Sequence, residues 1–267
     1  MGIGGYLDTL DATLPSNKSN LAAVEAPMTN SVTAIAVLKR NYLFKDLPDA
    51  SLARIAALAV KHDYVRGEVI FSQGDRGDAL YGIAAGRVRI SATGAGGKEV
   101  FLSIMVPGDT FGEIAVMDGL PRTAGATALD NTRLLVIRRP DLLKLLEQEP
   151  KLGVQLMRLL CMRLRWTSEL VEESAFLGGP ARLAKRLLIL ASLHGRPNPP
   201  DRLELRISQA ELAHFLGISR QMVNQHLREW QKSGWVELGR GRIAIRNKDA
   251  LREFIAQSEI DGPDGPE

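Results

Sequence analysis

The feature that most constrains the fold of this chain is a change of pattern close to Pro140. From Tyr64 to about Ile137, short β-branched or alternating runs are separated by turns rich in Gly and Asp. Many short strands with such turns predict an all-β sandwich or barrel of the jelly-roll kind. Beyond Pro140 the strand pattern ends and helical periodicity takes over. We therefore expect a mixed fold, with a barrel followed by a helical part, rather than one uniform domain.

Two short helices are expected before the barrel, between Ala34 and Lys61, because apolar residues recur there at helical spacing around Pro48. A long helix is expected after it. Its apolar stripe has a 4-3-4-3-4 spacing and consists of Leu152, Leu156, Leu159, Arg163, Trp166 and Leu170. Such a stripe is usually core packing within one chain, but this helix lies between two domains, so we interpret it as a homodimer seam. The single cysteine, Cys161, is interpreted as a buried thiol on this helix.

The C-terminal part contains a helix-turn-helix pattern. Ser208 and Glu211 have the spacing of a capping box, and Gly217 allows the chain to turn before a second cap at Ser219. A helix that presents Arg and Gln after such a turn fits the DNA major groove, where Arg pairs with guanine and Gln with adenine. The predicted DNA-contacting residues of this helix are Ser219, Arg220, Gln221, Asn224, Gln225 and Arg228.

A short hairpin is predicted after the second helix, around Gly239-Arg240-Gly241-Arg242. It would form a wing that offers Arg240 and Arg242 to DNA phosphates. Residues 180–250 contain thirteen Lys and Arg against six Asp and Glu, whereas the whole chain is only +3 at pH 7. This basic block supports a phosphate-backbone contact. The alternatives are a basic but merely solvated surface and a winged domain that binds protein.

The barrel region also carries a resemblance to a known domain. The runs from Gly67 to Phe71, from Gly74 to Asp78 and from Gly86 to Val88 resemble the cyclic-nucleotide-binding domain, and residues 107–124 are similar to its phosphate-binding cassette. With the winged helix behind it, the chain from about residue 34 resembles the cyclic-AMP receptor protein/FNR family of bacterial transcription regulators. The resemblance implies a sequence-specific, DNA-binding homodimer controlled by a cyclic nucleotide.

The chemistry of the cassette fits a cyclic phosphodiester, which carries one negative charge. Arg122 is expected to bind its exocyclic oxygens, Gly112 to let backbone amides approach, Glu113 to accept from a ribose hydroxyl and Thr123 to donate to the phosphate. The resemblance assigns the same four positions to ligand contacts. The alternative is a structural ion pair between Arg122 and Glu113 in a barrel that no longer binds ligand.

The resemblance further implies that Thr167 and Ser168 on the long helix reach the purine, with the serine coming from the partner subunit. Trp166 departs from the smaller residue of the family. Cyclic AMP is the first choice of ligand, cyclic GMP the second and a cyclic dinucleotide the third. Gln221 and Gln225 replace the glutamate and arginine that the family uses for base contacts, so we expect a different half-site.

The domain organisation that follows is α+β: a cyclic-nucleotide-binding jelly-roll barrel, a dimerisation helix and a winged helix-turn-helix. The expected boundaries are a flexible extension at 1–30, the barrel at 31–150, the dimerisation helix at 151–178, the DNA-binding domain at 179–256 and a flexible tail at 257–267.

Several other classes are disfavoured by the composition. One cysteine excludes a cysteine-ligated iron–sulfur cluster within the chain, and four scattered histidines suggest neither a metal site nor a catalytic nucleophile motif. We expect no metal and no enzyme activity. The absence of a secretory pattern or a long apolar run predicts a cytoplasmic protein without membrane contact. The expected partners are a pseudo-palindromic operator and RNA polymerase. The alternative functions are a ligand-independent or cyclic di-GMP-dependent regulator, and a ligand-binding module that regulates another protein.

Overall fold

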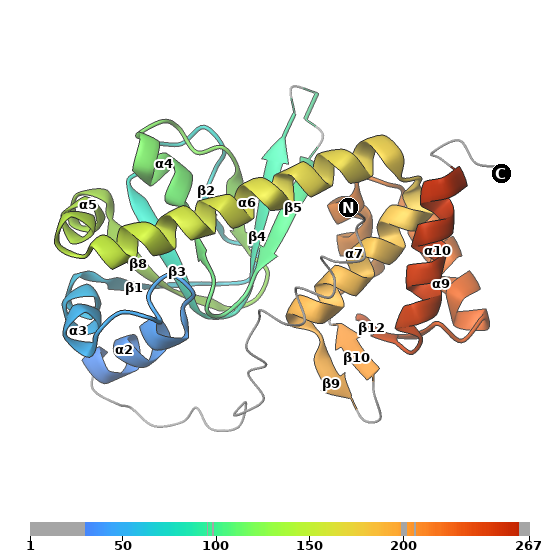
Figure 1. Ribbon diagram of the computed structural model, residues 1–267, viewed down its shortest axis with the longest axis horizontal. Helices are drawn as coiled ribbons and strands as arrows, with labels where there is room; N and C mark the ends of the chain where they lie inside the picture. The colour runs from blue at the N-terminus through green and yellow to red at the C-terminus, as the bar shows by residue number, and fades with distance from the viewer. Residues whose placement is uncertain (1–29, 95, 98, 199–201, 206, 262–267) are drawn as a thin grey trace.

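The computed structural model describes residues 30–94, 96–97, 99–198, 202–205 and 207–261 (Figure 1). These residues form a β-barrel, a long helix and a C-terminal unit. All but Asn30 of the extension predicted at 1–30 lies outside the described residues, and so does 262–267 of the predicted tail.

The barrel consists of two antiparallel four-stranded sheets with the strand orders β1-β8-β3-β6 and β2-β7-β4-β5. The first sheet contains β1 (Val60–Tyr64), β8 (Thr132–Arg138), β3 (Ala79–Ala85) and β6 (Thr110–Phe111). The second contains β2 (Val69–Phe71), β7 (Gly125–Ala128), β4 (Val88–Thr93) and β5 (Glu99–Met105). Buried residues from both sheets, among them Ile83, Leu134, Val88 and Ala126, form one core. The predicted jelly-roll barrel is confirmed.

Helices cover one end of the barrel and form a second core. They are α2 (Asn30–Arg40), α3 (Asp49–Leu58), α5 (Arg139–Gln148) and α6 (Pro150–Phe176). A short helix, α4 (Glu113–Asp118), follows β6. In Figure 1, α6 runs along the barrel from α5 to the C-terminal unit. The helix therefore connects the two parts of the molecule.

The stripe that the sequence suggested as a homodimer seam faces the protein's own interior, so that prediction is wrong. Leu152, Leu156 and Leu159 are buried in the core shared with α2, α3 and α5. Arg163 and Trp166 also make contacts with the barrel of the same chain. The physical reason is that the barrel presents apolar surface along this face of α6, and burial within the chain satisfies the stripe.

A second apolar stripe lies on the exposed face of α6. Its members, at the 3-4-3-4-3 spacing of a coiled coil, are Val154, Met157, Cys161, Leu164, Ser168 and Val171. Val154, Met157, Leu164 and Val171 are 44–68% exposed. Cys161 is exposed as well, so the expectation of a buried thiol is also wrong.

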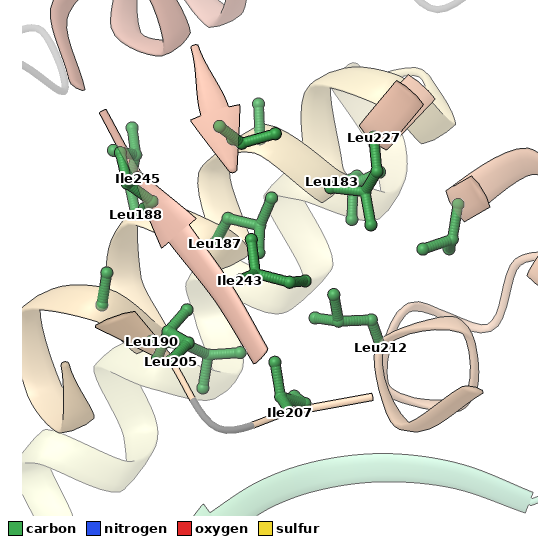
Figure 2. Packing of buried hydrophobic residues seen from close by; sticks show 14 of the residues in the cluster. Leu183, Leu187, Leu188, Leu190, Leu205, Ile207, Leu212, Leu227, Ile243 and Ile245 are labelled. Carbon is green, nitrogen blue, oxygen red and sulfur yellow. The ribbon is translucent and has the colours of Figure 1, made fainter. Parts of the chain in front are cut away.

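The C-terminal unit is built around one sheet of order β11-β12-β10-β9. Its elements are α7 (Gly179–His194), β9 (Arg196–Asn198), β10 (Arg202–Leu205), α8 (Gln209–Leu216), α9 (Arg220–Lys232), β11 (Val236–Gly239), β12 (Arg242–Ile245) and α10 (Lys248–Asp261). Leu187 of α7, Leu212 of α8 and Ile243 of β12 point into a common core (Figure 2). This is a winged helix-turn-helix, as predicted.

Helix α10 is an addition to the predicted elements, and it continues through 257–261, so the predicted boundary of the flexible tail at 257 is wrong. Leu251 and Ile255 are buried against the core, and α10 packs on α7. This burial keeps the chain helical beyond the predicted boundary.

The barrel and the C-terminal unit are in direct contact. Helix α8 packs against β5, and Phe101 and Ile104 of β5 belong to the same buried cluster as Leu212. Among the described helices, none is long and apolar enough to cross a membrane.

Candidate ligand site and DNA interface

The turn between β6 and α4 depends on Gly112. This residue has φ 84°, a left-handed conformation that glycine adopts at low cost. A Cβ at this position would lie 2.7 Å from Nη1 of Arg122 and 3.2 Å from the Ala79 carbonyl. The glycine therefore allows the backbone to approach the arginine closely.

Arg122 is the central charge of this region, and it is only 4% exposed. Its Nη1 donates to the Gly112 carbonyl at 2.8 Å and its Nη2 to the Ala79 carbonyl at 2.7 Å. The guanidinium lies 4.3 Å from the ring centre of Phe71 and 5.5 Å from that of Tyr81. Its Nε is buried and has no hydrogen-bond partner among the described residues. A buried cation held by neutral groups favours an anion beside it.

Glu113, the first residue of α4, is 4% exposed and lies 3.5 Å from Nε of Arg163 on α6. Among the described residues, no ion pair joins Arg122 to Glu113, so the alternative of a structural ion pair between these two residues is wrong. Arg163 also donates to the Thr110 carbonyl at 3.0 Å. Burial raises the pKa of the neighbouring Asp109, which accepts from the Val106 amide.

Arg163, which lies in this group, is not among the ligand residues that the sequence predicts. The signal was present, because it is the one cation in the stripe that is otherwise apolar. A charge at such a position must find a partner when the stripe is buried. Only the fold shows that the partner is Glu113.

The remaining predicted ligand residues lie at the edge of this group. Thr123 follows Arg122 and is exposed. Thr167 and Ser168 are exposed on α6, where their hydroxyls donate to the carbonyls of Arg163 and Leu164 at 2.9 and 3.0 Å. The structure thus brings Gly112, Glu113 and Arg122 together, whereas the α6 hydroxyls remain free to exchange their local bonds for a ligand.

The helix-turn-helix is held by the caps that the sequence indicates. Ser208 Oγ accepts from the Glu211 amide at 3.1 Å, and Glu211 accepts from the Ser208 amide at 2.7 Å. Gly217 has φ 65° at the turn. Ser219 caps α9 by accepting from the Met222 amide at 3.1 Å. The hydroxyl of Ser219 therefore has a structural role in addition to the DNA contact predicted for it.

Helix α9 has one buried and one exposed face. Val223, Leu227 and Trp230 are at most 4% exposed. The predicted DNA-contacting residues of α9 lie on its other faces: Arg220, Gln221, Gln225 and Arg228 are exposed and Asn224 is half-buried. The arrangement presents a polar, basic helix face to a partner.

The wing continues this surface. Gly241, with φ 69°, turns the chain between β11 and β12, and Arg240 is exposed beside it. Arg242 is 57% exposed and lies 3.4 Å from Glu204 of β10. Arg220 and Arg242 line a common cleft with the start of α8.

Between the two sites lies a buried group of charges. Trp166 donates from Nε1 to the Leu102 carbonyl of β5 at 3.2 Å, and its ring lies 4.4 Å from the guanidinium of Arg186 on α7. Arg186 pairs with Glu173 of α6, and Lys185 lies 3.4 Å from the same carboxylate. Burial lowers the pKa of Arg186 below its ordinary value. This group joins the barrel, α6 and the C-terminal unit.

Each of the two parts of the chain matches a known domain family. Residues 61–149 match the cyclic nucleotide-binding domain, and residues 181–254 match the Crp-like helix-turn-helix domain. The chain is 32% identical to the CRP-like cAMP-activated global transcriptional regulator of Mycobacterium tuberculosis over 216 residues, which are 80% of this chain and 96% of the relative. It is 33% identical to the cyclic AMP receptor protein of Thermus thermophilus over 217 residues, 81% of this chain and 98% of the relative.

Solved structures agree with this relationship. A CRP/FNR family transcriptional regulator from Thermus thermophilus superposes with a TM-score of 0.58 at 27% identity, over 74% of this chain and 98% of that one. Members of the family are DNA-binding transcription factors and not enzymes. The chain belongs to the Crp/Fnr family and is a cyclic-nucleotide-binding transcription regulator.

Proposed function

We propose that this protein is a homodimer whose affinity for a pseudo-palindromic operator is controlled by cyclic AMP bound in the barrel. The observation that carries the proposal is the buried guanidinium of Arg122, which has only neutral oxygen partners among the described residues and one free donor. A cyclic phosphodiester supplies the single negative charge that this environment lacks.

The bound nucleotide would contact residues from three directions. Its phosphate would accept from Arg122 and Thr123, with the backbone at Gly112 close to it. Its ribose hydroxyl would donate to Glu113, and its purine would face Thr167 and the partner subunit's Ser168. The grouping of Gly112, Glu113 and Arg122 at one end of α4 supports this assignment.

The dimer would form along the exposed face of α6. The second apolar stripe has coiled-coil spacing and includes the exposed Ser168, which supports a contact between the purine and the partner helix. Solvent-exposed Leu164 and Val171, at 68% and 64%, would become buried in the dimer.

The ion pair between Glu113 and Arg163 offers a route from ligand to helix. When the ribose hydroxyl donates a hydrogen bond to the Glu113 carboxylate, the attraction between Glu113 and Arg163 is weakened. Helix α6 can then shift. Such a shift changes DNA binding only if the ligand favours one arrangement over the other. The two recognition helices would then lie one DNA turn apart, roughly 34 Å.

Cyclic AMP is the first choice because two relatives that match most of this chain are named for it. Cyclic GMP is the second choice, since Thr123 suits either nucleotide, and cyclic di-GMP is the third. RNA polymerase is the further partner that we propose for the bound dimer.

The test is a calorimetric titration of the full chain with each of the three nucleotides. We expect micromolar binding of cyclic AMP that is lost in Arg122→Ala and weakened in Arg122→Lys, because lysine keeps the charge but not the paired donors. Arg133→Ala is the matched control, since this arginine is 55% exposed and pairs with Asp63 on the outside of β1. Binding that survives in Arg122→Ala would contradict the site.

A ligand-binding module that regulates another protein is the second function to test. The basic outer face of α9 and the wing favours DNA instead. A gel-shift assay on genomic fragments separates the two functions, because a module gives no specific shift with any nucleotide, whereas the regulator gives one that Arg220→Ala weakens.

A further inference from the structure

The recognition helix carries one acidic residue whose role the function proposed above does not explain. Glu229 lies on α9, one turn after Gln225. A carboxylate near the DNA-facing surface repels phosphates, so its presence there has a cost in affinity. The contacts of Glu229 indicate what offsets this cost.

Gln225 is at the centre of the outer face of α9. Residues of an α-helix are separated by about 100°, so Gln225 is about 180–200° away from the centre of the buried stripe. That stripe consists of Val223, Leu227 and Trp230. A helix inserted into the major groove with the buried stripe against its own domain therefore directs Gln225 at the base edges.

Glu229 fixes one edge of the Gln225 amide. Nε2 of Gln225 donates to Oε1 of Glu229 at 3.2 Å. A carboxylate has no proton to donate, so the edge that faces it must be the NH2 group. Turning the amide over would bring two acceptors together and lose the bond. The amide is thus held in one of its two orientations.

The carboxylate is held in turn by the core of the domain. Oε2 of Glu229 lies 2.9 Å from Nδ1 of His226, which is 20% exposed. The His226 ring lies 6.2 Å from the ring of Trp230, which is 4% exposed. Hydrogen bonding from Gln225, together with His226 and Lys232, holds the pKa of Glu229 below its ordinary value. The carboxylate therefore stays ionised and accepting.

We propose that Glu229 is a specificity-determining positioning residue, which presets the Gln225 amide to read adenine. One N–H of Gln225 is used by Glu229, so one N–H and the carbonyl oxygen remain for the base. Adenine offers the complementary N7 acceptor and N6 donor at its major-groove edge. Guanine offers only acceptors there, N7 and O6, so one of its contacts with the fixed amide is repulsive.

The test rests on the proposed DNA binding and uses the full-length dimer with its nucleotide. In vitro selection from random half-sites first gives the operator, and affinities are then measured for all four bases at every half-site position. The position read by Gln225 is the one at which Gln225→Ala removes the base preference. We expect the wild type to prefer adenine at this position.

Glu229→Gln is the decisive variant. Its neutral amide holds the NH2 group of Gln225 less tightly than the carboxylate does. Both N–H groups of Gln225 can then turn to guanine and donate to N7 and O6, so the preference for adenine over guanine at this one position should fall about tenfold. Preferences at the other positions should be unchanged. Glu253→Gln removes an exposed carboxylate from α10 of the same domain, and this control variant should retain the full adenine preference.

Three results would overturn the inference. In the first, the wild type prefers guanine at the position that Gln225 reads. In the second, Glu229→Gln keeps the full preference for adenine at that position. In the third, Gln225→Ala changes the base preference at no position of the half-site. Each leaves specific operator binding in place. A wild type with no specific operator would instead overturn the proposed function, and this inference with it.

Discussion

At the scale of single residues, the candidate ligand site is an arrangement of buried charges that the fold only partly neutralises. Arg122 has carbonyl partners and Glu113 has Arg163. The sequence groups Gly112, Glu113 and Arg122 by the chemistry of phosphate and ribose recognition, and the structure brings these three residues together. The sequence was not sufficient to predict Arg163, because linear spacing does not show which distant carboxylate meets a cation.

Gly112→Ala tests the close approach at the cassette. The substitution forces a side chain into the left-handed region, and its Cβ would displace the Arg122 guanidinium, 2.7 Å away. We expect a loss of about 1–3 kcal/mol of stability. We also expect a nucleotide affinity lower by roughly 10- to 100-fold, the value of one charge-assisted hydrogen bond. Thermal unfolding and calorimetric titration measure the two effects.

Gly67→Ala is the matched control for this variant. Gly67 has φ 87°, but a Cβ there meets nothing within 4 Å. It should therefore lose a similar amount of stability and keep its nucleotide affinity. An equal loss of nucleotide affinity in both variants would show that backbone strain, and not the approach to Arg122, is responsible.

At the scale of elements, α6 shows where prediction from the sequence reaches its limit. The helix has two apolar stripes, and periodicity alone does not tell which stripe packs on the barrel. The stripe with Leu152, Leu156 and Leu159 is buried in the chain's own core. The capping box of α8 was predictable because it depends on neighbouring residues only.

Val171→Asp tests the exposed stripe of α6 as the dimer seam. Burying one valine contributes roughly 1.5 kcal/mol, and a symmetric dimer has two copies, so the dissociation constant should rise at least about 100-fold. Val65→Asp is the control, because Val65 and Val171 are both 64% exposed and Val65 lies on the barrel. Sedimentation equilibrium should find a monomer only for Val171→Asp. If Val171→Asp and Val65→Asp are equally dimeric, the dimer seam lies elsewhere in the molecule.

Substitutions in the wing and in the recognition helix α9 should change the salt dependence and the sequence preference of DNA binding in different ways. Arg240, exposed at the tip of the wing, is expected to contact phosphate. Arg240→Ala should weaken all sequences alike and reduce the salt slope of binding by about two for the dimer. Arg220→Ala should mainly reduce the preference for the operator over random DNA. Fluorescence anisotropy at several salt concentrations distinguishes the two patterns, and a sequence-selective effect of Arg240→Ala would contradict its assignment.

At the scale of the whole molecule, contacts along α6 and into α7 connect the two candidate sites. Arg163 joins Glu113 to α6, and Trp166 lies one helical turn further along. Trp166 connects β5 to Arg186 of α7, which pairs with Glu173. The sequence predicts the helices of both parts, but it does not show that a tryptophan and a buried ion pair join them.

Trp166→Leu removes the hydrogen bond to β5 and the aromatic face under Arg186, while it retains an apolar side chain at this position. Both binding sites remain intact, so cyclic AMP and DNA should still bind. The factor by which the nucleotide raises operator affinity should fall about tenfold, since the two lost contacts together contribute about 1–2 kcal/mol. Trp166→Phe, which keeps the ring and loses the donor, should give an intermediate value.

Thermodynamic reciprocity makes this prediction strict. The factor by which the nucleotide raises operator affinity must equal the factor by which the operator raises nucleotide affinity. Trp166→Leu should therefore lower both factors equally, while the affinity for nucleotide in the absence of DNA stays constant. The opposite result is a lower affinity of the free protein for nucleotide, with both coupling factors unchanged. Trp166 would then belong to the ligand site. The barrel and the DNA-binding unit would be connected through the contact of β5 with α8.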